Sequence, residues 1–139
     1  MKGLYHYTST FHLPQILSCD YLKLTRGILD DYAVWFTTSI TPSGNGLEGS
    51  VVDKGEIRFV MKDILAIKWK DYRKKFTKGK DRILREKWAD ALEVNQKPGT
   101  WWLTTDFVTL DNVQAIENIR TGIKIDFPAP IDEILDKLI

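Results

Sequence analysis

The chain has 139 residues, with 20 Lys and Arg, 19 Asp and Glu, and a formal net charge of +1. This length is that of one ordinary domain, so we expect a single domain over residues 1–139. The single cysteine, Cys19, excludes an intramolecular disulfide, and no apolar run approaches the ~18 residues that span a bilayer. Because the N-terminus also lacks a leader-like apolar segment, we expect a cytoplasmic protein that does not enter membranes.

Strand and helix signals alternate over the first forty residues. Residues 4–7 form a short aromatic run typical of a strand. Residues 11–19 carry apolar side chains at helical spacing, with a proline in the first turn, and this pattern predicts that Cys19 is buried or half-buried. Residues 21–25 are a second short strand candidate. Residues 33–38 have the strongest strand pattern in the chain, because they are rich in aromatic and β-branched side chains.

A loop, a strand and a helical segment follow. Residues 40–55 contain four glycines and a proline, which is typical of a loop. Residues 56–62 alternate apolar and polar side chains, as a strand does. Residues 68–87 and the few after them supply one or two helices. Two apolar faces at helical spacing are expected there: Trp69, Tyr72 and Phe76, then Ile83, Leu84, Trp88 and Ala91 or Leu92.

Two more strands and a closing helix complete the pattern. The strand candidates are residues 101–108 and 113–119. Residues 130–139 begin with proline, carry acids in the first turn and have one apolar side, all of which predict a helix. Runs of strands separated from clustered helices favour an α+β domain over a doubly wound parallel sheet.

Charge is unevenly distributed along the chain. Residues 68–87 hold ten Lys or Arg against three acids, a local charge of +7, whereas the remainder holds ten against sixteen, a charge of −6. Two interpretations stay open. The basic segment is either a solvated helical face or a binding surface for nucleic acid or an anionic protein.

A histidine and several hydroxyl groups mark the ends of two predicted strands. His6 lies within the first strand, which ends in Thr8 and Ser9, and the strongest strand likewise ends in hydroxyl residues after Trp35 and Phe36. An isolated histidine in a strand is commonly a satisfied core group. If the two strands are neighbours, however, their ends present an imidazole, hydroxyls and aromatic rings to one cleft, which suits a sugar and a flat base.

These motifs resemble a known family. The series LYHYTS, LPQIL, YLKL and AVWFTTS, within about residues 3–39, is similar to the opening of the ADP-ribosyltransferase-like fold. The resemblance is to the His–Tyr–Glu group, which includes poly-ADP-ribose polymerases, diphtheria-type toxins, DarT-type DNA-modifying toxins and, more distantly, tRNA 2′-phosphotransferases. It implies a split antiparallel sheet with flanking helices, NAD as the substrate, and transfer of ADP-ribose to a protein or nucleic acid.

The resemblance also implies roles for individual residues. His6 would hydrogen-bond the ribose next to nicotinamide, and Trp35 or Phe36 would stack on the nicotinamide in place of the family's tyrosine. Arg58 is a candidate for binding phosphate, because a guanidinium pairs bidentately with phosphate oxygens, or else a surface arginine on a polar strand face. The complete predicted nucleotide-binding set is His6, Tyr7, Thr8, Ser9, Trp35, Phe36, Thr37, Arg58 and Trp102.

The family's catalytic glutamate has no evident counterpart. Thr100, Trp101 or Trp102 stands where the resemblance places that acid. Glu93 and Glu117 are the candidate catalytic acids, and each is otherwise an ordinary surface acid. The missing acid leaves open a non-catalytic module on the same fold, which binds or sequesters a nucleotide or binds a macromolecule. A small RNA-binding or RNA-processing protein is a second alternative. No Cys and His cluster predicts a metal site.

Overall fold

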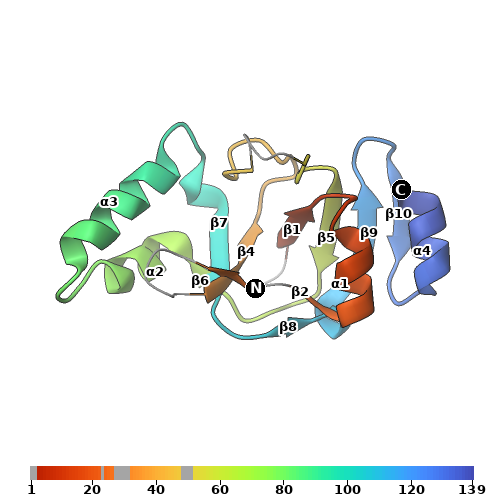
Figure 1. Cartoon of the computed structure of the whole chain (residues 1–139), viewed down its shortest axis with the longest axis horizontal. Coiled ribbons are helices and arrows are strands. Elements are labelled where there is room, and N and C mark those ends of the chain that lie inside the picture. The colour runs from red at the N-terminus through yellow and green to blue at the C-terminus, as the bar shows by residue number, and fades with distance from the viewer. Residues whose placement is uncertain (1–2, 23, 27–31, 48–51) are drawn as a thin grey trace.

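The computed structural model describes residues 3–22, 24–26, 32–47 and 52–139 (Figure 1). Its largest element is an antiparallel sheet in the order β10–β9–β5–β1–β4–β7–β6, with β3 paired to β4. The strands are β1 (Tyr5–Thr8), β3 (Thr25–Arg26), β4 (Tyr32–Thr37), β5 (Ile57–Met61), β6 (Ile67–Lys68), β7 (Trp101–Thr104), β9 (Val113–Asn118) and β10 (Ile123–Asp126). A separate pair is made by β2 (Tyr21–Leu22) and β8 (Val108–Thr109).

Four helices accompany the sheet in the described part of the chain. They are α1 (Leu13–Cys19), α2 (Trp69–Phe76), α3 (Arg82–Glu93) and α4 (Ile131–Leu138), and 3₁₀ turns cover Pro98–Thr100 and Leu110–Asn112. In Figure 1, α2 and α3 lie at one end of the sheet and α4 lies at the other. The prediction of an α+β fold is therefore confirmed. None of these helices combines the length and the apolar character that crossing a membrane requires.

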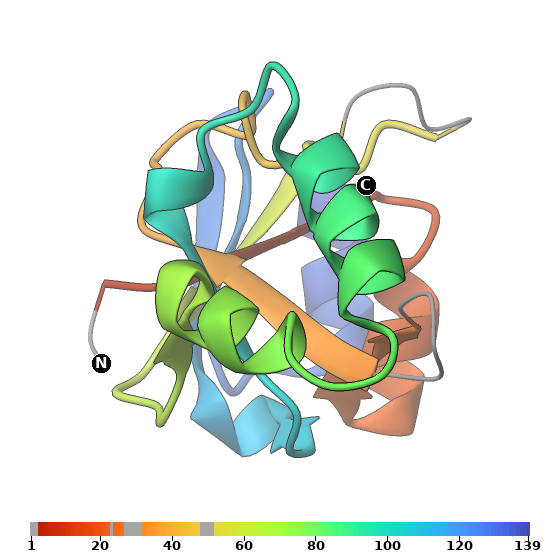
Figure 2. The ribbon, with the colours of Figure 1, turned by 90° about the vertical axis from the view of Figure 1, so that its left-hand side faces the viewer.

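Two separate apolar clusters hold the elements together. The larger one is formed by one face of the central strands, with Phe36 and Phe59, and by buried residues of α1 and α4. The smaller one is aromatic and includes Trp69 and Trp101, which join α2 and α3 to the strands β4 and β7. Figure 2 shows α2 and α3 lying across β4 on this side. Because neighbouring strand residues point to opposite faces, Phe36 belongs to the first cluster and Trp35 packs against the second.

The local predictions fail at two helices and two strands. In α3, Ile83 and Leu84 are 63% and 44% exposed, whereas Ala89 is fully buried, because the inward face is set by packing on α2 rather than by the apolar run. Cys19 is exposed rather than buried, since it ends α1 on the side away from the core. The strands β6 and β10 were not predicted: β6 has only two residues, and β10 buries one side chain of four.

Candidate functional site

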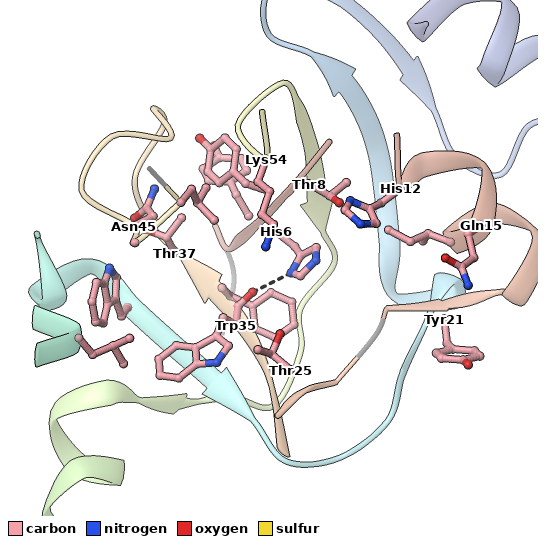
Figure 3. A pocket seen from close by; sticks show the side chains of 18 of the residues that line it. His6, Thr8, His12, Gln15, Tyr21, Thr25, Trp35, Thr37, Asn45 and Lys54 are labelled. Atoms are coloured by element: carbon pink, nitrogen blue, oxygen red, sulfur yellow. Dashed lines mark hydrogen bonds between the residues drawn. The ribbon is translucent and has the colours of Figure 1, made fainter. Parts of the chain in front are cut away.

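A pocket lies where β1 and β4 separate. In the described chain these two strands pair at a single position, Tyr5 with Thr37, whereas β1 pairs with β5 over four residues and β4 with β7 over four. A cavity of about 430 Å³, in the size range of small-molecule sites, is lined by residues of both strands (Figure 3). His6, Trp35 and Phe36, distant in the sequence, are thus brought to the same cavity.

The imidazole of His6 spans the gap between the two strands. Its Nδ1 lies 2.7 Å from the carbonyl oxygen of Trp35. A carbonyl can only accept a hydrogen bond, so Nδ1 carries the proton and Nε2 of the neutral ring is an acceptor. No described residue forms a hydrogen bond with Nε2. The ring therefore satisfies a carbonyl that the parting strands leave unpaired, and it retains one acceptor for a ligand.

A second histidine contributes to the same pocket. The Ser9 hydroxyl accepts a hydrogen bond from the backbone N–H of His12 and lies 2.6 Å from Nδ1 of its ring. Ser9 is fully buried, so its hydroxyl hydrogen needs an acceptor, and Nδ1 is the acceptor that the described residues supply. With Nδ1 as the acceptor, the His12 ring carries its proton on Nε2. His12 lines the pocket and Ser9 does not, so the prediction that Ser9 lines the site is wrong.

Aromatic rings form one side of the pocket. Phe36 is only 3% exposed and meets His6 edge to face with 5.9 Å between ring centroids, while Trp35 is half-buried and offers more of its surface. Trp101 also lines the pocket, whereas its neighbour Trp102 packs against the larger core cluster. Trp101 therefore takes the place in the pocket that was predicted for Trp102, because the register of β7 on β4 decides which face each ring occupies.

Three further residues of the predicted set, Tyr7, Thr8 and Thr37, line the pocket, and their hydroxyl groups differ in their hydrogen bonds. The Tyr7 hydroxyl donates to the Ser39 carbonyl at 3.0 Å, and the Thr37 hydroxyl donates to Thr100 Oγ1 at 3.0 Å. The Thr8 hydroxyl has no hydrogen-bond partner among the described residues, although the residue lines the cavity. Thr8 is thus the hydroxyl of the three that is available to a ligand, while Tyr7 and Thr37 hold the chain after β4 in place.

The glycine-rich loop after β4 forms another wall. Asn45 and Gly46 line the pocket, and the loop is fastened to the segment before β7. The Gly44 carbonyl accepts hydrogen bonds from the Lys97 backbone at 2.9 Å and from the Trp101 indole at 3.1 Å. Gly44 has a φ of +82°, a backbone conformation that residues other than glycine rarely adopt. Its identity therefore matters to the shape of this wall.

Among the described residues, the pocket lining carries one lysine and no acidic side chain. Lys54 lines the pocket and extends toward His6 in Figure 3, and no described carboxylate pairs with its ammonium group. Together with the two histidines, Lys54 supplies the polar groups that a phosphate or another anion would contact.

Arg58 lies behind the pocket rather than in it. Its guanidinium donates to the Glu117 carboxylate at 2.6 Å and to the Ile40 carbonyl, and it lies over the Tyr5 ring with 4.8 Å to the centroid. Tyr5 lines the pocket, but neither Arg58 nor Glu117 does. The structure thus gives Arg58 the role of holding Tyr5 and the loop, and it places Glu117 in an ion pair away from the cavity.

Glu93 is also engaged elsewhere. It lies at the end of α3, where its carboxylate accepts hydrogen bonds from Arg73 and from the Trp69 indole, the latter at 3.3 Å. It does not line the pocket. The two predicted catalytic acids are therefore both held by arginines outside the cavity.

Several residues that line the pocket are not in the set predicted from the sequence. His12, the N-cap residue of α1, lines the pocket together with Gln15 and Cys19 of that helix. Their spacing of three and four residues places them on one helix face, directly after the strand that carries His6, so this signal was present in the sequence. Asn45 and Lys54, by contrast, lie in a loop, where no periodicity indicates which side chains face a cavity.

The His6 environment predicts a pH dependence of stability. Burial lowers the pKa of His6 below its ordinary value of 6.5, and the bond to the Trp35 carbonyl offsets this only in part. As the pH falls below 6.5, the unfolded chain takes up a proton that the folded chain refuses, so the unfolding free energy decreases. We expect the unfolding free energy, measured with urea, to fall less between about pH 7.5 and about pH 5 for His6→Asn than for the wild type. Parallel declines would contradict this role of burial.

Neither a metal-binding cluster nor a match to a known protein indicates what this pocket binds. The described residues contain no group of three or more His, Cys, Asp or Glu side chains placed to hold a metal ion. Comparison of the chain with known proteins finds no matching family model, no matching curated protein and no matching solved structure.

Proposed function

We propose that the pocket binds NAD or a closely related nucleotide, on an ADP-ribosyltransferase-like split sheet. One observation carries the proposal: His6 of β1 and Trp35 of β4 line a single cavity at the place where their strands part. Such a cavity offers together an acceptor, a hydroxyl that no described residue engages, and aromatic surface. These are the groups that recognise a ribose and a flat base.

The chemistry of the wall fits the parts of a nucleotide. Nε2 of His6 can accept a hydrogen bond from a ribose hydroxyl, and the half-buried Trp35 ring can lie against a base. Lys54 and the N–H of His12 can contact phosphate oxygens. The anionic ligand would meet no carboxylate among the described lining residues, so nothing described there repels its phosphates.

The absence of a carboxylate among the described lining residues favours nucleotide binding over rapid transfer of ADP-ribose. Breaking the bond to nicotinamide develops positive charge on the ribose, which a nearby carboxylate stabilises in the transition state. Glu93 and Glu117 are both engaged with arginines away from the cavity. The proposed function is therefore a nucleotide-binding module. Transfer of ADP-ribose to a protein or nucleic acid is the second candidate, which the position of His6 supports.

Cys19 provides a direct test, because it is the only cysteine of the chain, is exposed and lines the pocket. We expect saturating NAD to slow the reaction of Cys19 with a thiol reagent several-fold, since the ligand covers the thiol. Isothermal titration with NAD, ADP-ribose and a cyclic dinucleotide gives the affinities in parallel. Radiolabelled NAD then separates the two candidates: binding without nicotinamide release supports the module, and release or label transfer supports the enzyme.

A matched control shows whether NAD itself changes the reactivity of the thiol reagent. The variant Cys19→Ser/Lys62→Cys carries its thiol at an exposed position outside the pocket, and NAD should leave its labelling rate unchanged. If none of the three nucleotides protects Cys19 or gives heat of binding, the proposal fails.

A further inference from the structure

The α2–α3 hairpin carries many cationic side chains that pair with no carboxylate in the described part of the chain. Eight exposed Lys and Arg side chains on it form no ion pair with any described carboxylate: Lys68, Lys70, Lys74, Lys75, Lys78, Lys80, Arg82 and Lys87. Arg73 differs, because it is paired with Asp90 and Glu93 and joins the two helices. We call the eight unpaired residues the basic face.

The basic face stands on a rigid support. Trp69 is 2% exposed and contacts the rings of Trp35, Tyr72, Trp88 and Trp101. The aromatic side chains of the hairpin are therefore turned toward the sheet, and the lysines remain at the surface. A set of cations fixed in this way loses little conformational freedom of the backbone when it binds an extended anion.

The end of the sheet opposite to the hairpin carries a negative charge. Residues 126–139, which include α4, hold four acids against one lysine, and that lysine is paired with Glu133. Figure 1 shows α4 at the end of the sheet opposite to α2 and α3. The separation of charge along the sequence is thus also a separation in space. Such a distribution orients an approaching polyanion toward the hairpin.

We propose that the basic face binds the phosphate backbone of a polynucleotide. Seven of the eight unpaired cations are lysines. Lysine is depleted in protein–protein interfaces but is a common phosphate ligand, so the composition favours a nucleic acid over an acidic protein. Binding of this kind contacts phosphates rather than base edges, and it is therefore tolerant of sequence and strongly dependent on salt. The inference does not rest on the nucleotide-binding function proposed for the pocket.

Fluorescence anisotropy with a labelled single-stranded RNA of about 20 nucleotides tests the proposal. The affinity should fall steeply between about 50 mM and about 200 mM salt. The variants Lys78→Gln/Lys80→Gln, in the turn between the helices, and Lys75→Gln/Lys87→Gln, on the helices, should each bind about tenfold or more weakly, with a shallower salt slope. DNA of the same sequence and an RNA duplex show which polynucleotide is preferred.

The controls separate a local effect from net charge. Lys62→Gln/Lys124→Gln removes the same charge from exposed positions outside the hairpin and should bind within about twofold of the wild type. His6→Asn should also retain RNA affinity, even if it loses nucleotide binding in the pocket. Equal losses in the hairpin and control variants would overturn the proposal. So would binding of poly-L-glutamate as tightly as RNA, which would indicate an acidic protein partner instead.

Discussion

Replacing His6 with asparagine should weaken nucleotide binding about tenfold to a hundredfold while leaving the fold intact, because about 1–3 kcal/mol of hydrogen bonding to the ligand is lost. An asparagine amide can still donate to the Trp35 carbonyl, which the imidazole reaches at 2.7 Å. It cannot reproduce Nε2, which lies further from the backbone. Calorimetric titration with the tightest-binding nucleotide, together with urea unfolding of the same samples, measures both quantities.

The alanine variant separates the two functions of the same ring. His6→Ala removes the donor to Trp35 as well as the acceptor in the pocket, so it should also lower the unfolding free energy by about 1–3 kcal/mol. His6→Asn should remain within about 1 kcal/mol of the wild type. If His6→Asn binds nucleotide as well as the wild type, His6 serves the carbonyl alone and the assignment of the site is wrong.

Replacing Trp69 with alanine should lower the unfolding free energy by about 3–5 kcal/mol, a large part of the stability of a domain of this size. Trp69 is 2% exposed, and its centroid lies 5.3 Å from that of Trp35 and 6.2 Å from that of Trp101. Its indole also donates to Glu93. The substitution thus opens a cavity between the hairpin and the sheet and removes a contact that orders α3. Chemical denaturation measures the loss.

Phe107→Ala is the matched control for Trp69→Ala. It also removes an aromatic ring, but Phe107 is 71% exposed, so its loss should cost no more than about 0.5 kcal/mol. Hydrogen exchange should show that Trp69→Ala loses protection first in α2 and α3. Equal stability of the two variants would mean that the aromatic cluster does not hold the hairpin to the sheet.

Local pattern predicted much of the secondary structure. The aromatic and β-branched residues of β4 and the alternation in β5 place strands close to where they occur, since these side chains fit a pleated surface. The helical spacing in α1 and α4 was likewise sufficient. Where the pattern misled, as with Ile83 in α3, packing against another element decided which face turned inward.

The sequence by itself determined that an imidazole, hydroxyls and aromatic rings end two strands, and that the cations are concentrated in one segment. Only the tertiary structure decided that β1 and β4 part after one pairing, that His6 binds the Trp35 carbonyl across this gap, and that Glu93 is held by Arg73. It likewise brought Lys54 into the pocket from a loop. The physical reason is that strand order and register depend on contacts between distant residues, which local periodicity does not encode.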